Sequence, residues 1–328
     1  MLLGVVGLVC YFAAVQGPQE AGLVEETQFE AFTVKYGKSY KDQEELQFRF
    51  QQYRRAAAFV NAHNAQGSSF SLEINEFADF TEEEFRAKYL TSFPESKQRK
   101  LKSSILPTGD LPEQVDWASF GAVSPIQNQG SCGGCWAFAT VGAIEGLLYI
   151  QNKTLYQLSP QQLIDCSSSF GNEGCNGGLM DDAFKYVLQA GGVETEKDYP
   201  FRRHNGKCQA DEKKYVGRIQ SYADVPIRNE LQLKAAVAQQ PVAVGIQANQ
   251  GTFMYYHSGV ISSGCGTNLD HAVLVVGYGE EAGKPYWLVK NTWGAYWGEK
   301  GFVKILREDA NDATTGMCGI ASMPSYPL

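Results

Sequence analysis

The pattern of hydrophobic and polar positions divides the chain into stretches of different character. Residues 2–15 are almost wholly apolar, and small and polar residues follow them. This stretch is shorter than the roughly 20 apolar residues of a membrane-spanning helix, and it is typical of the hydrophobic region of a signal peptide, although no basic segment precedes it. We therefore expect residues 1–17 to be a signal peptide rather than a buried N-terminal helix. No later segment is apolar enough to predict a membrane anchor.

Residues 18–110 combine helical patterns with many charged side chains. Within residues 45–64, six positions recur every three or four residues and therefore lie on one face of a predicted helix. These positions are Glu45, Arg49, Tyr53, Ala56, Val60 and Asn64. A second helix is expected after Thr81, because threonine is a good N-cap and three glutamates follow it at the positive end of the helix dipole. Residues 92–109 are rich in serine, basic residues and proline, which is typical of an exposed linker where proteolysis concentrates.

From residue 111 onward the pattern is first helical and then strand-like. Residues 135–150 are apolar nearly all round, which is typical of a helix at the centre of a domain. Ser159 as N-cap and Pro160 at the first helical position predict another helix, and residues 180–190 predict a third. Strands are predicted at residues 242–246, 272–278, 286–290 and 301–306. This part of the chain is therefore expected to have a helical first half and a β-rich second half.

Length and charge narrow the classes of protein. The 328 residues are enough for two domains, and 44% hydrophobic and 20% charged residues are ordinary for a globular protein. The net charge is −8, and the basic run at residues 97–102 is short and isolated, so we expect no nucleic-acid partner.

The eight cysteines bear on both the compartment and the chemistry. Cys10 would leave with the signal peptide, and the oxidising conditions of secretion would pair the others. Seven remain, and an odd number leaves one free thiol. The seven are Cys132, Cys135, Cys166, Cys175, Cys208, Cys265 and Cys318.

Cys135 is the candidate for the reactive thiol, because it would open the buried helix. The positive end of a helix dipole favours the thiolate, which is the reactive form of cysteine. Cys132 and Cys135 could instead form a redox pair or half of a zinc site. A redox pair should follow a strand, and none is predicted there. A zinc site needs a second pair at similar spacing, whereas Cys166 and Cys175 are nine residues apart. We therefore predict no metal and no cofactor.

A cysteine nucleophile needs a base, and histidine is the natural one. His204 lies in a charged loop and His257 follows two tyrosines, so both are expected near the surface. His271 opens an apolar strand, which is a good place for a catalytic group at the edge of a cleft. Asn291 follows the predicted strand 286–290, and its amide oxygen could fix the tautomer of the imidazole. Two tryptophans just after it would shield that hydrogen bond from water.

These residues resemble papain-like cysteine proteases, and among them the cathepsin L-like branch. The family pattern is Cys-Gly-Ser/Ala-Cys-Trp/Tyr, and residues 132–136 read Cys-Gly-Gly-Cys-Trp. In the family, histidine and asparagine follow the nucleophile by roughly 130–150 residues, and here His271 and Asn291 follow Cys135 by 136 and 156 residues. Thr292 stands where serine is common. Neither the glycine at position 134 nor the threonine at position 292 removes a catalytic group.

The region before Leu111 resembles the inhibitory prosegment of that branch. Residues 45–64 match its helix motif, with Ala56 in place of asparagine, and residues 73–79 (EINEFAD) match a second motif with glutamate in place of glycine. The resemblance implies a helical inhibitory propeptide over residues 18–110 and a mature protease domain over residues 111–328, with a cut within residues 103–111. It also implies the α+β papain-like fold, in which an active-site cleft separates a helical left domain from a β-barrel-like right domain.

Carried over position by position, the resemblance implies the roles of the site residues. Cys135 would be the nucleophile, His271 the general base and acid, and Asn291 the orienting amide. Gln129 would form the oxyanion hole with the backbone N–H of Cys135. The implied substrate-binding positions are Gly133, Gly177, Gly178, Leu179, Met180, Gly245, Leu269, Trp293 and Met323. The implied disulfides are Cys132–Cys175, Cys166–Cys208 and Cys265–Cys318.

The predicted function is therefore a cysteine endopeptidase made as an inactive zymogen, secreted or delivered to a lysosome or vacuole. It would cleave polypeptides through an acyl-enzyme on Cys135 and prefer a bulky apolar residue at the second position before the scissile bond. Its own propeptide and cystatin-type inhibitors are the expected protein partners, and the mature enzyme is expected to be a monomer. Asn152 begins an N-glycosylation sequence that fits this route.

Two alternatives compete with the endopeptidase prediction. A catalytically silent papain-like storage or binding protein would be favoured by loss of the cysteine, histidine or asparagine, and all three are present. An exopeptidase would carry an inserted, histidine-bearing loop over the cleft, and nothing between Cys175 and Cys208 looks like it.

Overall fold

The computed structural model describes residues 18–91, 93, 103, 105–309 and 314–328, without the side chains of residues 18–21. The predicted signal peptide, residues 1–17, and most of the predicted linker at residues 92–109 lie outside the described residues.

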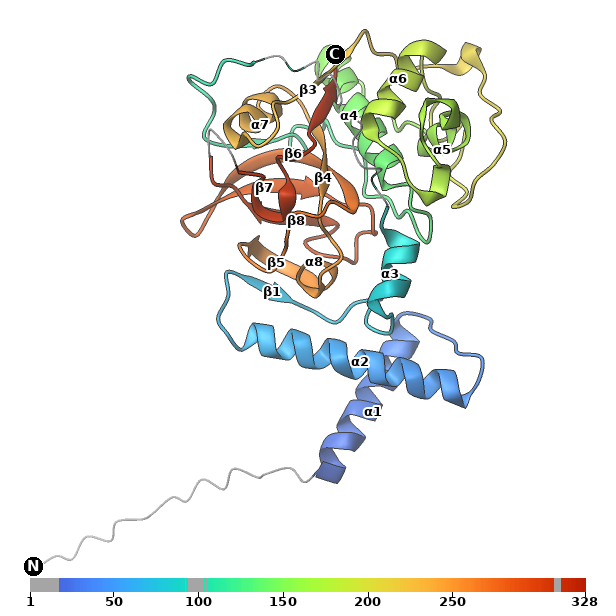
Figure 1. The fold of residues 1–328 in the computed structure, drawn as a ribbon, viewed down its shortest axis with the longest axis vertical. Coiled ribbons are helices and arrows are strands. Elements are labelled where there is room, and N and C mark those ends of the chain that lie inside the picture. The colour runs from blue at the N-terminus through green and yellow to red at the C-terminus, as the bar shows by residue number, and fades with distance from the viewer. Residues whose placement is uncertain (1–17, 92, 94–102, 104, 310–313) are drawn as a thin grey trace, which may run out of the picture.

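The first two helices form a separate small lobe that the sequence predicted only in part. Helices α1 (Pro18–Lys35) and α2 (Gln43–Asn64) cross each other below the rest of the molecule (Figure 1). They are held together by aromatic packing, with ring centroids 5.4 Å apart for Phe29 and Tyr53 and 5.1 Å apart for Phe32 and Tyr53. Helix α1 was not predicted from the sequence.

The predicted face of α2 is confirmed. Tyr53, Ala56 and Val60 are buried against the lobe. Asn64, at the end of the helix, donates to the carbonyl of Leu72 at 2.8 Å and accepts from its N–H at 2.9 Å. The last residue of the helix motif therefore holds the main chain of the strand that follows by two hydrogen bonds.

That strand, β1 (Phe70–Leu72), joins the small lobe to the larger one. It pairs antiparallel with β5 (Tyr256–Ile261) and so extends the sheet of the larger lobe. Helix α3 (Glu82–Tyr89) then rises toward the junction between the two halves of the larger lobe (Figure 1). It begins as predicted, because Thr81 accepts from the N–H of Glu84 while the Glu84 carboxylate accepts from the N–H of Thr81.

The three helices predicted for the first half of the larger lobe are present. They are α4 (Cys135–Asn152), α5 (Pro160–Cys166) and α6 (Met180–Ala190). The hydroxyl of Ser159 accepts from the N–H of Gln162 at 3.0 Å and caps α5, with Pro160 at its first position. Short 3₁₀ turns lie between α5 and α6, at Ser168–Phe170 and Gly174–Asn176, and later in the chain at Glu212–Lys214 and Met317–Gly319.

The second half is built on the sheet. Within the described residues nine strands form it, in the order β1-β5-β8-β7-β6-β4-β9-β3, with β2 paired to β6. The bounds are β2 Val115–Asp116, β3 Tyr222–Asp224, β4 Val242–Ile246, β6 His271–Glu281, β7 Lys284–Lys290, β8 Phe302–Leu306 and β9 Ser325–Pro327. The four predicted strands are β4, β6, β7 and β8. Two helices, α7 (Glu230–Val237) and α8 (Gly251–Met254), interrupt this half and were not predicted.

Helix α4 packs unusually close to the sheet, and glycines make the approach possible. A Cβ on Gly142 would lie 2.9 Å from Cδ2 of Leu274 in β6, and one on Gly146 would lie 2.6 Å from Cγ of Pro241. At such distances an added methyl group would force the neighbouring side chain to move. The helical and the β-rich halves therefore meet along a fixed seam, with the N-terminus of α4 near the start of β6.

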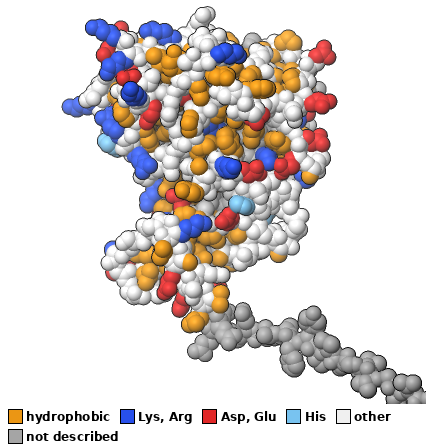
Figure 2. Space-filling view, turned by 180° about the vertical axis from the view of Figure 1, so that it is seen from behind, with side chains coloured by type: hydrophobic (Ala, Val, Ile, Leu, Met, Phe, Trp, Pro, Cys, Tyr) orange, Lys and Arg blue, Asp and Glu red, His pale blue; other side chains and the backbone are white. Residues whose placement is uncertain are grey.

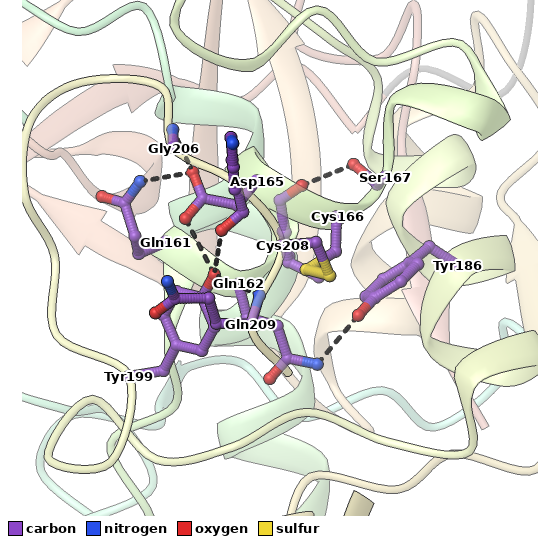
Figure 3. Close-up of a disulfide and its surroundings, with 12 residues drawn as sticks. Gln161, Gln162, Asp165, Cys166, Ser167, Tyr186, Tyr199, Gly206, Cys208 and Gln209 are labelled. Carbon is purple, nitrogen blue, oxygen red and sulfur yellow. Dashed lines mark hydrogen bonds between the residues drawn. A yellow bond between two sulfur atoms is a disulfide. The ribbon is translucent and has the colours of Figure 1, made fainter. Parts of the chain in front are cut away.

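The loop between α6 and α7 is fastened to α5 by a buried carboxylate. Asp165, whose side chain is fully buried, accepts from the hydroxyl of Tyr199 at 2.8 Å and from the N–H of Gly206 at 2.7 Å, and it pairs with Arg202 at 2.5 Å (Figure 3). The disulfide next to it joins Cys166 to Cys208. Loop 199–208 is therefore held at both ends.

The three disulfides implied by the resemblance are all present, and Cys135 is free. In the described part of the chain, no helix is long and apolar enough to cross a membrane.

Figure 2 shows the molecule from behind, with the small lobe below the large one. On this face, basic side chains gather mainly along one edge of the large lobe and acidic side chains along the other.

Candidate active site

Cys135 lies at the first position of α4, where the two halves of the large lobe meet. Its side chain is buried, and its Sγ accepts from the backbone N–H of Ala272 in β6 at 3.4 Å. The loop before it is pinned by the Cys132–Cys175 disulfide and by a bond from the N–H of Gly133 to the carbonyl of Cys175 at 2.9 Å. The thiol therefore has a fixed position beside the first residues of β6.

His271 opens β6 and is oriented as the sequence predicted. Its Nε2 lies 2.8 Å from Oδ1 of Asn291, and the ring of Trp293 stacks on it with centroids 4.8 Å apart. Because an amide oxygen only accepts, Nε2 carries the proton, and Nδ1 of a neutral ring is left with its lone pair. Nδ1 has no hydrogen-bond partner among the described residues. The free lone pair is the feature that a general base needs. Trp297 packs on Trp293, with ring centroids 5.3 Å apart, and not on the imidazole. Of the two tryptophans expected to shield the hydrogen bond, Trp293 is therefore the one that stacks on His271.

Gln129 is held with its amide N–H groups directed into the cleft. Its Oε1 accepts from the hydroxyl of Thr292, so Nε2 must be the donor end. Nε2 donates to the carbonyl of Cys132 at 2.9 Å and to the carbonyl of Tyr89 at 3.0 Å. The threonine at position 292 thus sets the amide orientation, a role that the sequence did not reveal.

The segment after α3 runs through the cleft and covers this site. The carbonyl of Tyr89 takes the Gln129 donor, and the N–H of Thr91 donates to the carbonyl of Asp270 at 2.8 Å. Between them the carbonyl of Leu90 would lie 3.0 Å from a Cβ on Gly133. A polypeptide main chain therefore already occupies the groove.

Aromatic side chains anchor this segment above His271. Phe77 and Phe85 are fully buried and pack edge-on against Trp293, with ring centroids 5.5 and 5.2 Å away. Tyr89 packs on Phe77 at 4.9 Å. Burying such rings is the main source of docking free energy for a small helical segment.

Burial sets the protonation of the site in this covered state. It raises the pKa of the Cys135 thiol to about 12 and lowers the pKa of His271 to about 4. Both groups are therefore neutral near pH 7. In this covered state, burial has a larger effect on the pKa of the thiol than the helix dipole has. Ionisation of the pair requires water to return to the cleft.

Three of the predicted pocket residues lie together. A Cβ on Gly245 would lie 2.9 Å from Cε of Met323 and 3.1 Å from Cδ1 of Leu269. Leu179 and Met180, also predicted for the pocket, are buried at the start of α6. The pocket residues are thus apolar or small.

The fold itself requires glycine at the two positions predicted to pair with substrate. A Cβ on Gly178 would lie 2.7 Å from the ring of Trp136 and 2.5 Å from Oδ1 of Asn172, so packing inside the wall already demands glycine. Gly177 has φ +137°, which only glycine adopts readily.

A buried charged network behind the site was missed from the sequence. Lys290, the residue before Asn291, donates from Nζ to the carbonyl and the hydroxyl of Ser124 at 2.8 and 2.9 Å. The same hydroxyl donates to Glu145 of α4 at 2.5 Å. The network joins α4, which begins at Cys135, to the end of β7, which precedes Asn291. A lysine directly before the predicted orienting amide was the only signal in the sequence.

The comparisons with known proteins agree with this geometry. Residues 111–328 match the papain family cysteine protease profile, and residues 29–85 match the cathepsin propeptide inhibitor domain. The chain therefore belongs to the papain family of cysteine proteases, and it carries the cathepsin-type propeptide domain ahead of the protease domain.

Its relatives include plant proteases. It is 44% identical to the cysteine proteinase RD21A of Arabidopsis thaliana over 92% of this chain, and it spans about two thirds (66%) of that relative's length. It is 40% identical to the senescence-specific cysteine protease SAG39 of Oryza sativa subsp. indica over 100% of this chain and 98% of the relative.

Solved precursor structures have the same fold. A recombinant stem bromelain precursor has a TM-score of 0.85 at 36% identity and covers 93% of this chain and 99% of its own. The digestive procathepsin L2 of the Tenebrio molitor larval midgut has a TM-score of 0.85 at 37% identity, with the same shares covered. The predicted α+β papain-like fold is confirmed.

The aromatic anchor yields a testable prediction. Phe77→Ala should open the covered site, because truncating a fully buried phenylalanine typically costs about 3–5 kcal/mol. We expect Cys135 of this variant to react with iodoacetamide at pH 7.5 much faster than the thiol of the wild-type precursor. Mass spectrometry of the alkylated residue measures the rate.

Val34→Ala is the matched control, because Val34 is 83% exposed on the same small lobe. Its labelling rate should equal that of the wild type. Equal rates for Phe77→Ala and wild type would show that Phe77 does not keep the site closed.

Proposed function

We propose that this chain is the precursor of a cysteine endopeptidase of the secretory pathway, with Cys135, His271 and Asn291 as catalytic residues. One observation carries the proposal. The hydrogen bond from His271 to Asn291 leaves Nδ1 of the imidazole unpartnered in the same cleft as the free thiol. A thiol, a base and a group that orients the base are the parts of covalent catalysis by cysteine.

The geometry supports the following sequence of steps. Once water enters the cleft, Nδ1 of His271 takes the thiol proton, and the sulfur of Cys135 attacks the carbonyl carbon of the scissile bond. The tetrahedral oxyanion accepts hydrogen bonds from Nε2 of Gln129 and from the N–H of Cys135, a pairing typically worth about 2.7–4 kcal/mol per donor. The imidazolium then protonates the leaving amine as the C–N bond breaks, which leaves a thioester on the sulfur. Water, deprotonated by His271, hydrolyses the thioester and restores the thiol.

The prosegment inhibits by occupying the substrate groove. The carbonyl of Tyr89 accepts from the oxyanion donor of Gln129, where the substrate oxyanion would bind. We assign residues 1–17 to the signal peptide, residues 18–110 to the propeptide and residues 111–328 to the mature enzyme, with maturation within residues 103–111. Polypeptides are the substrates, and cystatin-type proteins are candidate inhibitors of the mature monomer.

Delivery through the secretory pathway is supported by the disulfides, which persist in oxidising compartments. The candidate glycosylation site fits, because Asn152 and Thr154 are exposed at the end of α4. The destination is a lysosome, a vacuole or the extracellular space.

The apolar pocket supports a preference for a bulky apolar residue at the second position before the scissile bond. Gly245, Leu269 and Met323 place apolar surface together, and none of the residues assigned to the pocket is acidic. An apolar side chain gains about 25 cal/mol per Å² that it buries, whereas a buried unpaired arginine loses solvation.

The first prediction of the proposed function tests the nucleophile. Cys135→Ala should give a folded precursor with its three disulfides and no peptidase activity, because Cys135 is the only described cysteine outside a disulfide. A fluorogenic dipeptide substrate measures the activity, and peptide mapping checks the disulfides. Residual turnover near the wild-type rate would contradict the assignment and would favour another nucleophile. An inactive wild-type enzyme would favour the silent-homologue alternative.

A second prediction concerns acid activation. Glu84 of α3 accepts from Arg49 of α2 at 2.5 and 2.8 Å, and this bond lowers the pKa of Glu84. A carboxylate with a lowered pKa stabilises the folded state above its unfolded value of about 4.3, and that stabilisation is lost as the pH falls further. We therefore expect autoprocessing to accelerate as the pH falls below about 4.5.

Other carboxylates of the prosegment do not act in that direction. Burial raises the pKa of Glu76, so its protonation in acid favours the docked state. Glu73 forms an exposed pair with His257 at 2.8 Å, which contributes little. The acid-labile contact is thus inside the prosegment. Glu84→Gln should process faster than wild type at pH 6, and gel assays of purified precursor at pH 4, 5 and 6 measure this. Identical pH profiles would exclude the Arg49–Glu84 pair as the trigger.

A third prediction concerns specificity. Met323 narrows the pocket, so leucine or valine at the second position should be cleaved at least as well as phenylalanine. In the Met323→Ala variant, kcat/KM for the phenylalanine substrate should rise relative to that for the leucine substrate, because the pocket becomes deeper. The measurement is kcat/KM on dipeptide substrates that differ at that residue only. Equal kcat/KM for the arginine and leucine substrates would refute the pocket assignment. A wild-type kcat/KM that is far higher for phenylalanine than for leucine would refute the role of Met323.

A further inference from the structure

Arg203 lies on the wall of the cleft beside the segment that carries Gln129. A Cβ on Gly130 would lie 3.0 Å from Cδ and 3.2 Å from Nε of Arg203, so the arginine side chain lies directly over the Gly130 backbone. Arg203 itself is exposed and has φ +62°, a left-handed conformation that favours glycine. This backbone conformation sets the direction in which the Cα–Cβ bond of Arg203 leaves the main chain.

The surrounding loop keeps Arg203 in place while leaving its charge free. Asp165 and the adjacent disulfide hold both ends of loop 199–208 (Figure 3). The neighbouring Arg202 forms an ion pair with Asp165 at 2.5 Å. No carboxylate of the described residues forms an ion pair with Arg203, so its guanidinium is available to a ligand.

The prosegment shows which end of the cleft Arg203 borders. It crosses the cleft from Trp293, against which its aromatic anchors pack, past Gln129 and on to Asp270. The apolar pocket includes Leu269, beside Asp270, and in the proposed function it takes a residue before the scissile bond. The opposite end, where the N–H of Gln129 donates to the carbonyl before Trp293 at 2.8 Å, therefore takes the residues after the scissile bond. Arg203 stands at that end.

An acidic side chain of the prosegment lies in the field of this arginine. Burial raises the pKa of Glu76, and the positive charges of Lys38 and Arg203 act in the opposite sense. Arg203 also acts electrostatically on Tyr89, whose carbonyl accepts from Gln129. Departure of the prosegment removes Glu76 from the field of Arg203, and an acidic side chain of a substrate can take its place.

We infer that Arg203 is a specificity-determining residue that favours an acidic side chain at the second or third position after the scissile bond. The inference rests on the proposed peptidase function. An exposed ion pair changes an equilibrium by about 1.5- to 5-fold, so the preference for glutamate over lysine should be of that size. Because the pair is exposed, salt should weaken the preference.

The test uses acid-activated enzyme and internally quenched peptides with leucine two positions before the scissile bond. The peptides carry glutamate, glutamine or lysine at the second or third position after it, and kcat/KM is measured at low and high salt. Wild type should prefer glutamate over lysine at one of these positions. Arg203→Gly should remove the preference without loss of folding, since glycine suits φ +62°, and Arg203→Lys should retain most of it.

Lys207→Gln is the matched control, because it removes one positive charge from the same loop and should leave the preference intact. Equal rates for glutamate and lysine in the wild type would overturn the inference. So would a preference that survives in Arg203→Gly, or one that Lys207→Gln removes equally. Turnover of the glutamine peptides by every variant shows that the peptidase function holds, and its absence in the wild type would contradict the proposed function itself.

Discussion

The seam between α4 and β6 is the constraint on which the site depends. Gly142 and Gly146 let the helix lie directly against Leu274 and Pro241, and no side chain on either residue could be accommodated without movement. The helix begins with the thiol and the strand begins with the imidazole, so the seam fixes their relation. The buried bridge from Glu145 through Ser124 to Lys290 adds the third group, because it ties the same helix to the end of β7.

The prosegment lies across this seam and covers the residues that we propose to be catalytic. It excludes water, which keeps Cys135 and His271 neutral, and it takes the donor of Gln129 for its own carbonyl. Aromatic rings of the prosegment are buried against Trp293, and such burial contributes to its binding. The Arg49–Glu84 pair joins α2 to α3 within the prosegment, so protonation of Glu84 weakens the inhibitor itself.

The sequence predicted the elements whose ends carry strong local signals. Helix α5 is an example, because serine and proline mark its start, and α3 another, because threonine and glutamate form its capping box. Helix α1 could not be predicted, because apolar residues such as Leu23 and Val34 are exposed and mark no buried face. The thiol and its base were found because the odd cysteine count demanded them. The orientation of Gln129 by Thr292 was not predictable, because the two residues are 163 positions apart and their contact exists only in the folded chain. The effect of the prosegment on Cys135 was not predictable either, because local sequence does not describe the segment that buries the thiol.

The pairing of β1 with β5 gives maturation a structural side effect. In the precursor, the three residues of β1 cap the edge of the sheet in antiparallel register. Loss of the propeptide removes that cap and leaves the amides and carbonyls of β5 facing solvent on one side. An uncapped edge is a template on which another extended chain can align. The strand is short and carries the exposed residue His257, features that limit such pairing. The precursor is thus the form with a closed sheet, and the active enzyme must tolerate an open one.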